Sequence, residues 1–440
     1  MKNANPDISR IIFHIDVNSA FLSWSAVKRL REDPSATDLR TIPSAVGGDV
    51  ETRHGIITAK SIPAKKYGVS TGEPVVSALK KCPNLVLVPS DRKTYREYSA
   101  AFVKILKKYA DEVEKVSVDE AFLDMSDPER FYEKAAASAR ADSGRTVPFE
   151  ESAAAALPYP LCAAEYIKNE IRDTLGFTVN VGISTNKILA KMASDFEKPD
   201  KVHTLYPDEI REKLWPLPIG ELFGCGQKTA ARLRSVGITT IGDAANMNLV
   251  NLQSILGSKA GEYIHRNANG ISDSPVTGEP EKAKSYSNET TTAEDVTESN
   301  YTKKGAPVVK RLAEGVAARL RKDNVRAYTV YVIVKTGEFR RHTRQTTLPD
   351  STDDPGVIAD TAASLMRELL YGRGGLFAEG RTLRLIGVGC TNLDESEYRQ
   401  MDLFSWAQTK KEDDEKKKRL DEMLSKVRGK YGEDAIRRGT

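Results

Sequence analysis

The 440-residue sequence contains few of the residues that build disulfide and zinc sites. Its four cysteines, Cys82, Cys162, Cys225 and Cys390, are far apart and form no CxxC pair, and its five histidines stand alone. This spacing argues against a disulfide framework and against a Cys/His zinc centre.

Long apolar runs are also missing. No stretch approaches the roughly 18 consecutive apolar residues of a membrane-spanning helix, and the apolar core of a signal peptide is absent from the N-terminal MKNANPDISR. We therefore expect a cytoplasmic protein that does not bind membranes. With 40 % hydrophobic and 29 % charged residues, the chain has room for about three folded domains of roughly 150 residues each.

A strong net charge of one sign is missing as well, because 66 basic residues face 62 acidic ones and leave only +4. The charge is unevenly placed, however. Residues 284–349 contain 13 Lys and Arg against 7 Asp and Glu, so this stretch is basic while the rest of the chain is slightly acidic. A polyanionic partner would therefore meet this stretch first.

Hydrophobic periodicity predicts that strands alternate with helices up to about residue 206. Predicted strands cover 11–17, 44–48, 55–59, 85–91 and 177–184, and predicted helices cover 18–33, 94–110, 163–176 and 186–196. We expect 85–91 to be a buried strand and 113–126 to be two short strands that meet at an acidic turn. The Ala-rich stretch 129–160 breaks the pattern and is predicted to be a surface insertion.

The second half of the chain predicts a helical region, a linker and another sheet domain. Residues 207–270 contain short helices broken by glycines, and 271–283 has the aperiodic composition of a linker. The order β-α-β-β-α-β follows, with strands at 284–292, 327–336, 338–348 and 381–393 and helices at 301–323 and 356–370. The remaining residues are predicted to be a polar tail with one helix.

Three acidic residues stand at strand ends or turns of the first sheet domain. Asp16 follows an apolar strand, and Asp119 and Glu120 lie between VSV and AFL. Strand alternation would send Asp119 and Glu120 to opposite faces, so both can serve one site only if a turn lies there, and we predict that turn. Carboxylates without nearby Cys or His favour Mg²⁺, and two such ions would support an in-line phosphoryl transfer. The alternative is that each acid is an ordinary solvated strand end or hairpin residue.

Basic residues near these acids would suit the binding of phosphates. Lys65 and Lys66 lie in PAKKYG, and Lys187, Lys191 and Lys198 lie in NKILAKMASDFEKP. The alternative for each lysine is a solvated helix face.

The segment FGCGQKTAARL resembles a helix-hairpin-helix, a motif that binds a DNA phosphate without reading sequence. Gly224 and Gly226 would let the backbone approach the phosphate, and Lys228 begins the next helix. A simple packing turn between two helices is the alternative.

Arginines alternate in the segment FRRHTR of the basic domain, where Arg340, Arg341 and Arg344 fit a strand that crosses a phosphate backbone. The alternative is an exposed strand that charge keeps soluble.

In the tail, QMDLFSW forms an apolar cluster in a hydrophilic run. Such a cluster usually docks on something, and its polar flanks favour another protein over this chain.

Together these motifs resemble the Y-family translesion DNA polymerases, nearest the bacterial polymerase IV branch. The resemblance covers residues 9–395 and rests, in order, on HIDVNSAF, GIITAKSIPAKKYGVSTGEP, SVDEAFLD, VGISTNKILAKMASDFEKP and FGCGQKTAARL, followed by the basic domain.

The resemblance implies an α+β, multidomain right-hand polymerase. Its expected parts are a palm (1–18 and 78–206), fingers (19–77), a helical thumb with the helix-hairpin-helix (207–270), a linker (271–283), a β-α-β-β-α-β little finger (284–395) and a tail (396–440). The implied activity is template-directed, low-fidelity DNA synthesis past lesions, without proofreading, by a monomer that uses primer-template DNA and deoxynucleoside triphosphates.

The resemblance also implies roles for single residues. Two Mg²⁺ ions would be held by Asp16, Asp119, Glu120 and the backbone carbonyl of Val17. Phe21 falls at the steric gate that excludes a ribose 2′-hydroxyl, and Lys65 and Lys198 fall at positions that bind the triphosphate. The pentapeptide QMDLF resembles the motif by which bacterial polymerases dock on the sliding clamp, with Gln400, Leu403 and Phe404 as anchors.

The chain departs from the family pattern at four positions. Asn18 and Ala20 stand where polymerase IV relatives usually carry Asp and Phe, and Ile62 and Lys65 replace a Tyr and an Arg that contact the triphosphate. Lys65 keeps the charge but loses the bidentate fork, and Ile62 donates no hydrogen bond. Three rivals stay open: an inactive DNA-binding accessory factor, a nucleotidyl cyclase and a structural clamp-binding protein.

Overall fold

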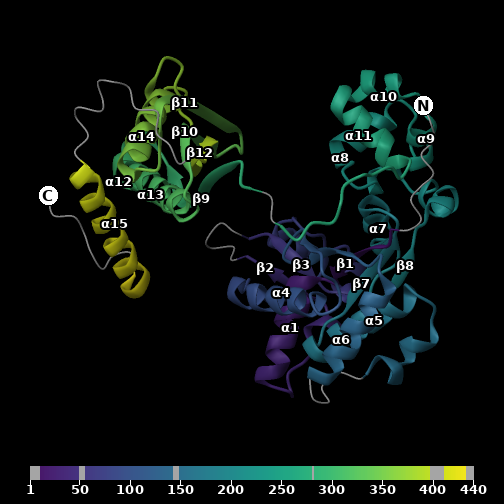
Figure 1. The fold of residues 1–440 in the computed structure, drawn as a ribbon. Coiled ribbons are helices and arrows are strands. Elements are labelled where there is room, and N and C mark those ends of the chain that lie inside the picture. Colours follow the sequence, from purple (N-terminus) through teal and green to yellow (C-terminus); the bar gives the residue numbers. More distant parts are fainter. Residues whose placement is uncertain (1–9, 49–54, 142–147, 280–281, 397–410, 433–440) are drawn as a thin grey trace. The chain divides into compact units, whose positions relative to one another are not determined.

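The computed structural model divides the chain into two compact units, Met1–Lys282 and Ala283–Thr440 (Figure 1). The structure describes residues 10–48, 55–141, 148–279, 282–396 and 411–432. Within this described part, no helix is long and apolar enough to cross a membrane.

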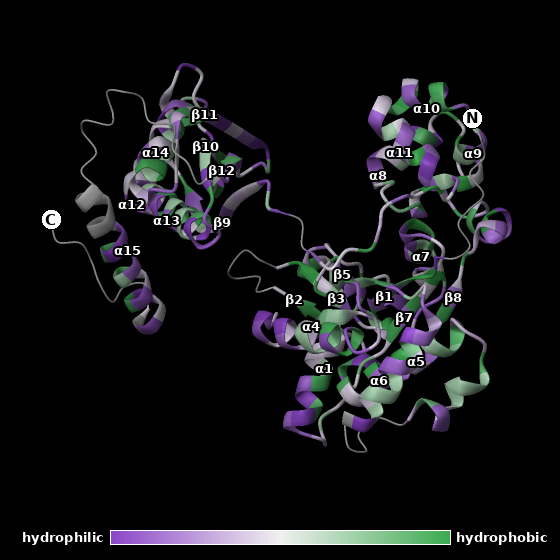
Figure 2. Cartoon of the chain, in the orientation of Figure 1, coloured by the Kyte–Doolittle hydropathy of each residue, from purple (hydrophilic) through white to green (hydrophobic). Residues whose placement is uncertain are grey.

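The first unit is built on a five-stranded sheet in the order β5-β6-β1-β7-β8. Its strands are β1 (Ile12–Val17), β5 (Val113–Lys115), β6 (Glu120–Asp124), β7 (Val179–Ser184) and β8 (Val202–Thr204). The central strand β1 pairs antiparallel with both β6 and β7, and all six of its residues are buried. Apolar residues follow these strands and the facing helices (green in Figure 2).

Helices cover both faces of this sheet. On one face, the core joins alternate residues of β1 to side chains of α1 (Ala20–Glu32), α4 (Arg92–Leu106), α5 (Pro128–Ala141) and α6 (Leu161–Leu175). On the other face lies α7 (Lys187–Ser194), which packs so closely on β7 that a Cβ at Gly182 would overlap the backbone of Ala190 and Ser194.

A smaller three-stranded sheet, in the order β3-β2-β4, forms its own core in the first unit. Its strands are β2 (Ser44–Gly47), β3 (Ile57–Lys60) and β4 (Val86–Val88), accompanied by the helices α2 (Ile62–Lys66) and α3 (Val75–Lys81). The strand expected at 85–91 is present as β4, but the expected burial is wrong, because β4 is a three-residue edge strand whose Val86 and Leu87 are 36 % and 38 % exposed.

A helical region follows β8 and has a separate apolar core. It contains α8 (Gln227–Arg234), α9 (Ile241–Asn246), α10 (Leu249–Leu256) and α11 (Ser258–Ala268). Among its described residues the only extended pairing is the isolated bridge between Pro218 and Thr240, which agrees with the absence of a strand pattern.

The second unit is a four-stranded antiparallel sheet in the order β11-β10-β12-β9, with helices packed on its apolar face. Its elements are β9 (Ser285–Val296), α12 (Tyr301–Lys304), α13 (Ala306–Lys322), β10 (Arg326–Thr336), β11 (Arg341–Thr352), α14 (Pro355–Tyr371), β12 (Leu383–Asp394) and α15 (Lys411–Tyr431). The predicted β-α-β-β-α-β order is confirmed, with α12 as a short extra turn before α13.

The predicted surface insertion at 129–160 is in part wrong. Its first half forms α5, and Phe131, Ala135, Phe149 and Ala154 are buried in the main core. The Ala-rich composition concealed this role, because Phe131 and Phe149 are the large buried side chains among the described residues of this stretch.

The predicted linker at 271–283 also makes more contacts than a free linker. Val276 is buried against Ile12, Phe122 and Ala190. The backbone N–H groups of the next two residues donate to two glutamates, from Thr277 to Glu114 of β5 at 3.1 Å and from Gly278 to Glu112, which precedes β5, at 2.8 Å. The first part of this segment is therefore docked on the sheet domain.

Candidate active site

Strand alternation places the first acid of the site. Phe13, Ile15 and Val17 point into the core beneath α4 and α6, so His14 and Asp16 point to the opposite face, toward α7. Asp16 lies directly opposite Glu120 in the β1–β6 ladder. Because directly opposed residues share a face, the two carboxylates are neighbours.

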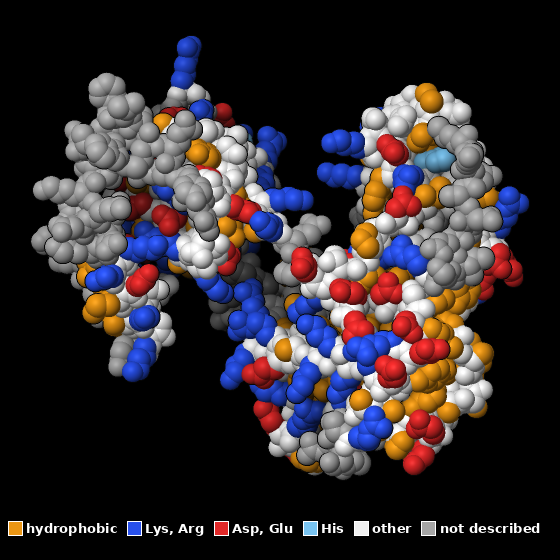
Figure 3. Space-filling model, in the orientation of Figure 1, with side chains coloured by type: hydrophobic (Ala, Val, Ile, Leu, Met, Phe, Trp, Pro, Cys, Tyr) orange, Lys and Arg blue, Asp and Glu red, His pale blue; other side chains and the backbone are white. Residues whose placement is uncertain are grey.

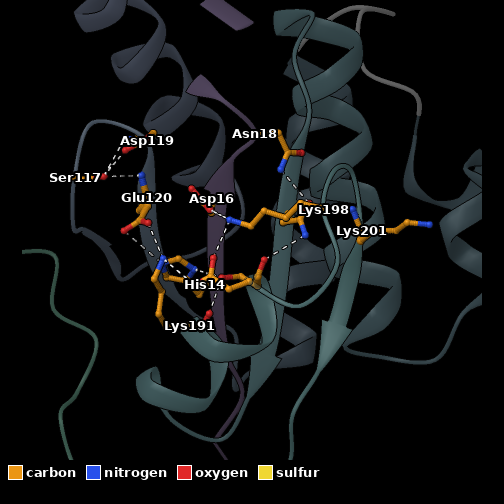
Figure 4. Close-up of polar contacts among 12 residues, drawn as sticks. His14, Asp16, Asn18, Ser117, Asp119, Glu120, Lys191, Lys198 and Lys201 are labelled. Carbon is orange, nitrogen blue, oxygen red and sulfur yellow. Dashed lines mark hydrogen bonds and ion pairs between the residues drawn. The ribbon is translucent and has the colours of Figure 1, made fainter. Parts of the chain in front are cut away.

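The predicted acidic turn is confirmed between β5 and β6. The hydroxyl of Ser117 accepts the backbone N–H groups of Asp119 (3.2 Å) and Glu120 (3.1 Å) and donates to Asp119 Oδ1 (2.6 Å). The backbone N–H of Val17 donates to the carbonyl of Asp119 at 3.0 Å. These bonds bring Asp119 beside the end of β1 although it lies outside the strand (Figure 4).

Two lysines neutralise the two neighbouring carboxylates. Lys191 of α7 binds Glu120 Oε1 at 2.6 Å, and Lys198, in the loop after α7, binds Asp16 and also Asp195 Oδ1 at 2.8 Å. Burial raises the pKa of Asp16 to about 6, although both lysines act in the opposite direction. The desolvated carboxylate therefore depends on a nearby cation to stay charged.

His14 is a buried member of the site that sequence reasoning did not single out. Its Nδ1 lies 2.8 Å from the hydroxyl of Ser194, and its Nε2 lies 3.9 Å from Glu120 Oε2. Burial lowers the pKa of His14 well below its usual value, and the charges of Lys191 and Lys198 add to this effect. The alternation that places Asp16 also places His14, so this residue could have been found from the strand pattern.

Asn18, noted from the sequence only as a departure, organises the loop that carries Lys198. Its Oδ1 accepts the backbone N–H of Asp200 (2.9 Å) and the hydroxyl of Thr178 (3.0 Å), and its Nδ2 donates to Asn180 Oδ1 (3.1 Å). An amide both donates and accepts here, which a carboxylate could not do.

Phe21 lies on the first turn of α1, five residues after Asp16. Its ring stacks on Tyr95 with centroids 4.7 Å apart and meets the edge of Trp24 at 6.0 Å. Ser25 adds a hydroxyl contact of 3.2 Å to Tyr95. The ring is half-buried and is supported from behind by α4.

The remaining predicted phosphate-binding lysines lie elsewhere in the first unit. Lys65 and Lys66 are exposed on α2, which begins at the 48 % exposed Ile62. Lys187 is bound by Glu114, with both oxygens at 2.6 Å, and by Ser274 and Pro275 of the docked segment. Its amine therefore binds Glu114 and the docked segment rather than Asp16, Asp119 or Glu120.

In the glycine hairpin of the helical region, one of the two glycines adopts a left-handed backbone conformation and the other does not. Gly224 has a φ of +83°, and a Cβ there would overlap the ring of Tyr263. Gly226 is the N-cap of α8 with an ordinary φ, and Lys228 is exposed on the first turn. The element before the hairpin is a single 3₁₀ turn, Ile219–Glu221.

The arginines of the basic domain do not share one strand face. Arg340 precedes β11, in the turn after β10. Arg341 reaches Glu289 at 3.6 Å, whereas Arg344 pairs in register with the fully buried Val332 and binds Glu368 of α14 at 3.3 Å. Lys and Arg side chains are interspersed with Asp and Glu on the visible face of each unit (Figure 3).

Among the described residues, no three Asp, Glu, His or Cys side chains gather closely enough to hold a metal ion. Asp16 and Glu120 are instead held by lysines and Asp119 by Ser117. The donor set itself, three carboxylates at adjoining strand ends, has the oxygen chemistry of a Mg²⁺ site. The predicted clamp anchors Gln400, Leu403 and Phe404 lie outside the described residues.

Comparison with known families matches three regions of the chain. Residues 15–195 match the impB/mucB/samB family, residues 283–403 match its C-terminal domain, and residues 220–272 match the thumb domain of DNA polymerase-iota. The chain is 37 % identical to DNA polymerase IV of Clostridium acetobutylicum over 98 % of each chain. It is also 34 % identical to DNA polymerase IV 1 of Bacillus subtilis, over 99 % of this chain and 94 % of the relative.

The chain belongs to the impB/mucB/samB family. It is a Y-family protein of the polymerase IV type, as the motifs indicated. Among solved structures, this family member resembles the Y-family DNA polymerase chimera Dbh-Dpo4(243-245)-Dbh with a TM-score of 0.68 and 25 % identity, over 88 % of this chain and 100 % of the chimera. The predicted right-hand fold class is confirmed. A Dbh ternary complex with a TM-score of 0.54 and 24 % identity, over 87 % of this chain and 98 % of that one, shows the same fold.

Proposed function

We propose that the chain is a DNA-directed DNA polymerase that extends a primer on a template and copies past lesions. One observation carries the proposal: Asp16 and Glu120 lie side by side at the end of β1, each already paired with a lysine, and Asp119 is fixed beside them. The full-length similarity to DNA polymerase IV proteins supports this assignment.

The proposal includes two Mg²⁺ ions bound by Asp16, Asp119, Glu120 and the backbone carbonyl of Val17. When bound, such ions lower the pKa of the primer 3′-hydroxyl and offset the charge that develops on the transferred phosphate. The lysine contacts support the fit, because positive charge already lies beside two of the carboxylates that would bind the ions.

The residues of the chain prepare and complete this arrangement. Lys191 and Lys198 hold Glu120 and Asp16. The amine of Lys198 would turn from Asp16 to the triphosphate of the incoming deoxynucleotide, with Lys65 of α2 as a second contact. Burial opposes the charged form of Lys198, but Asp16 and Asp195 raise its pKa, so it stays a cation.

We also propose that Phe21 selects deoxynucleotides. Its ring follows Asp16 by five residues and stacks on Tyr95. Because Tyr95 blocks its movement away from the site, the ring would clash with a ribose 2′-hydroxyl. An aromatic stack of this kind contributes about 0.5–1.5 kcal/mol beyond the area that it buries.

The remaining assignments extend the proposal to the whole chain. We assign residues 1–18 and 78–206 to the palm, 19–77 to the fingers, 207–270 to the thumb and 284–395 to the little finger. Primer-template DNA would contact Gly224, Gly226, Lys228, Arg340 and Arg341, whereas Arg344 lies on the other face of β11. The tail would bind the sliding clamp through Gln400, Leu403 and Phe404, and the protein would act in the cytoplasm as a monomer of low fidelity.

The test is primer extension with Mg²⁺ and deoxynucleotides on undamaged and damaged templates. The native chain should extend the primer. In the Asp119→Ala, Glu120→Ala double variant the rate of primer extension should fall by more than about a thousand-fold, while binding of primer-template is kept. The Phe21→Ala variant should incorporate ribonucleotides. A native chain that binds DNA but adds no nucleotide would instead favour the inactive accessory factor.

A further inference from the structure

Residues 197–201 belong to the loop that joins α7 to β8 and include Lys198. The backbone of this segment is bound on both sides of that lysine. On the upstream side, Asn180 Nδ2 donates to the carbonyl of Glu197 at 2.7 Å. On the downstream side, the backbone N–H of Asp200 donates to Asn18 Oδ1 at 2.9 Å.

The third anchor of this segment comes from α6 and holds Asp200. Lys168 of α6 is only 6 % exposed, and its amine donates to the backbone carbonyl of Asp200 at 3.1 Å. The same amine lies 3.2 Å from Asp200 Oδ1 and 3.2 Å from Glu165 Oε2. A single buried cation therefore binds both the main chain and the side chain of Asp200.

The conformation of Asp200 explains why such an anchor is needed. Its φ is +60°, in the left-handed region that non-glycine residues seldom adopt. Surrounding contacts must hold a residue in this region, and here Lys168 and Asn18 supply them. Burial of a lysine is costly unless it is paired, so the pairing with Asp200 and Glu165 is also what keeps Lys168 inside.

We propose that Lys168 and Asp200 are positioning residues for Lys198. This inference rests on the proposed function, in which Lys198 leaves Asp16 to bind the triphosphate. A lysine reaches its target on a flexible four-carbon stem, so the location of its backbone decides where the charge can go. The Lys168–Asp200 pair fixes the backbone two residues away from Lys198. It does so without a hydrogen bond or ion pair to Asp16, Asp119 or Glu120.

The experiment compares three variants of the full chain. Lys168→Met keeps the length of the buried stem but removes the buried cation from Asp200, which then keeps only the more distant Arg172, 3.8 Å from its Oδ2. Lys168→Arg restores a donor. Lys108→Met is the matched control, because Lys108 forms a similar ion pair with α6, at 2.9 Å from the buried Glu170, but does not contact the 197–201 loop.

Lys168→Met should raise the KM for deoxynucleotide about ten-fold, the scale on which supporting contacts act. The Kd for primer-template should stay within two-fold, on the order of experimental error. Lys168→Arg should recover most of the loss, and Lys108→Met should resemble the native chain. In a Lys198→Ala background, Lys168→Met should cause no further rise, because the lysine that it positions is gone.

Two results would overturn the inference while the polymerase assignment stands. One is a KM for deoxynucleotide that is equal in Lys168→Met and Lys108→Met. The other is an effect of Lys168→Met that adds in full to that of Lys198→Ala, which would indicate a general loss of structure.

A native chain that extends no primer would overturn the proposed function. Calorimetric binding of Mg²⁺-dATP would then decide about Lys168 independently of turnover. Weaker binding by Lys168→Met than by Lys108→Met upholds the positioning role, and equal binding refutes it.

Discussion

At the scale of single residues, the site depends on pairs of opposite charge within a buried environment. The carboxylate of Asp16 is desolvated and its pKa is raised to about 6, yet the neighbouring Lys198 favours its charged form. Glu120 is paired with Lys191 at 2.6 Å. Removal of either lysine would take away the direct partner of a partly or fully buried carboxylate, which is more costly than the loss of a surface pair.

Ser117 provides a test of the acidic turn. Ser117→Ala removes the acceptor for the N–H groups of Asp119 and Glu120, so we expect a loss of about 1 kcal/mol in stability. Extension should fall about ten-fold or more, because both acids lose their fixed orientation. Chemical denaturation and steady-state extension measure the two effects.

The control for this variant is Ser126→Ala, at the other end of the same strand β6. The hydroxyl of Ser126 accepts the N–H of Ile11 at 3.0 Å and also bonds Asp124. Its loss should lower stability by a similar amount and leave extension unchanged. Equal losses of extension in both variants would contradict a specific role for Ser117.

At the scale of elements, the position of α7 on the sheet decides where two lysines lie. The helix lies against β7 because position 182 is a glycine, and its burial draws Lys191 toward Glu120. The helix begins at Asn186, whose side chain accepts the N–H of Leu189 at 3.0 Å and whose Nδ2 donates to the carbonyl of Gly270. The same element therefore connects the acid site to the helical region.

Gly182→Ala should push α7 away from β7. A methyl group there would overlap the backbone of Ala190 and Ser194, so we expect a loss of about 2–3 kcal/mol in unfolding free energy, typical of an overpacked core. Extension should fall as well, since Lys191 and the loop after α7 would be displaced. Thermal unfolding and primer extension report both effects.

Gly315→Ala is the matched substitution in α13. A Cβ at Gly315 would meet no atom within 4 Å, so the change should stabilise the second unit by about 0.5–1 kcal/mol through helix propensity. The same Gly→Ala change is therefore expected to lower the free energy of unfolding at position 182 and to raise it at position 315. Stabilisation by both substitutions would refute close packing of α7 on β7.

At the scale of the whole molecule, the chain contains several separate cores. Each of the four buried cysteines belongs to a different one: Cys162 to the main sheet, Cys82 to the small sheet, Cys225 to the helical region and Cys390 to the second unit. Burial raises the pKa of Cys390 to about 12 and also raises that of Cys225. The thiols therefore report when each core opens.

Alkylation followed by mass spectrometry should find all four thiols protected in the native protein at pH 8. As denaturant rises, Cys390 should become reactive at a midpoint different from that of Cys162, because the two lie in separate compact units. A common midpoint for all four thiols would show that the chain unfolds as one cooperative unit.

Local pattern determined much of this protein from its sequence. Three features follow from neighbouring residues: the alternation of β1, the turn before Glu120 and the β-α-β-β-α-β order. The structure agrees with all three. These features need only short-range geometry, because the direction of a side chain along a strand and the position of a turn depend on a few adjacent residues.

Tertiary structure alone decided which residues meet. Asp16 and Lys198 are 182 residues apart, and Glu120 and Lys191 are 71 apart. The burial of Phe131 and the docking of Val276 have the same origin. Sequence spacing carries no information on such contacts, because chain packing brings distant segments together and fixes the partner of each charge.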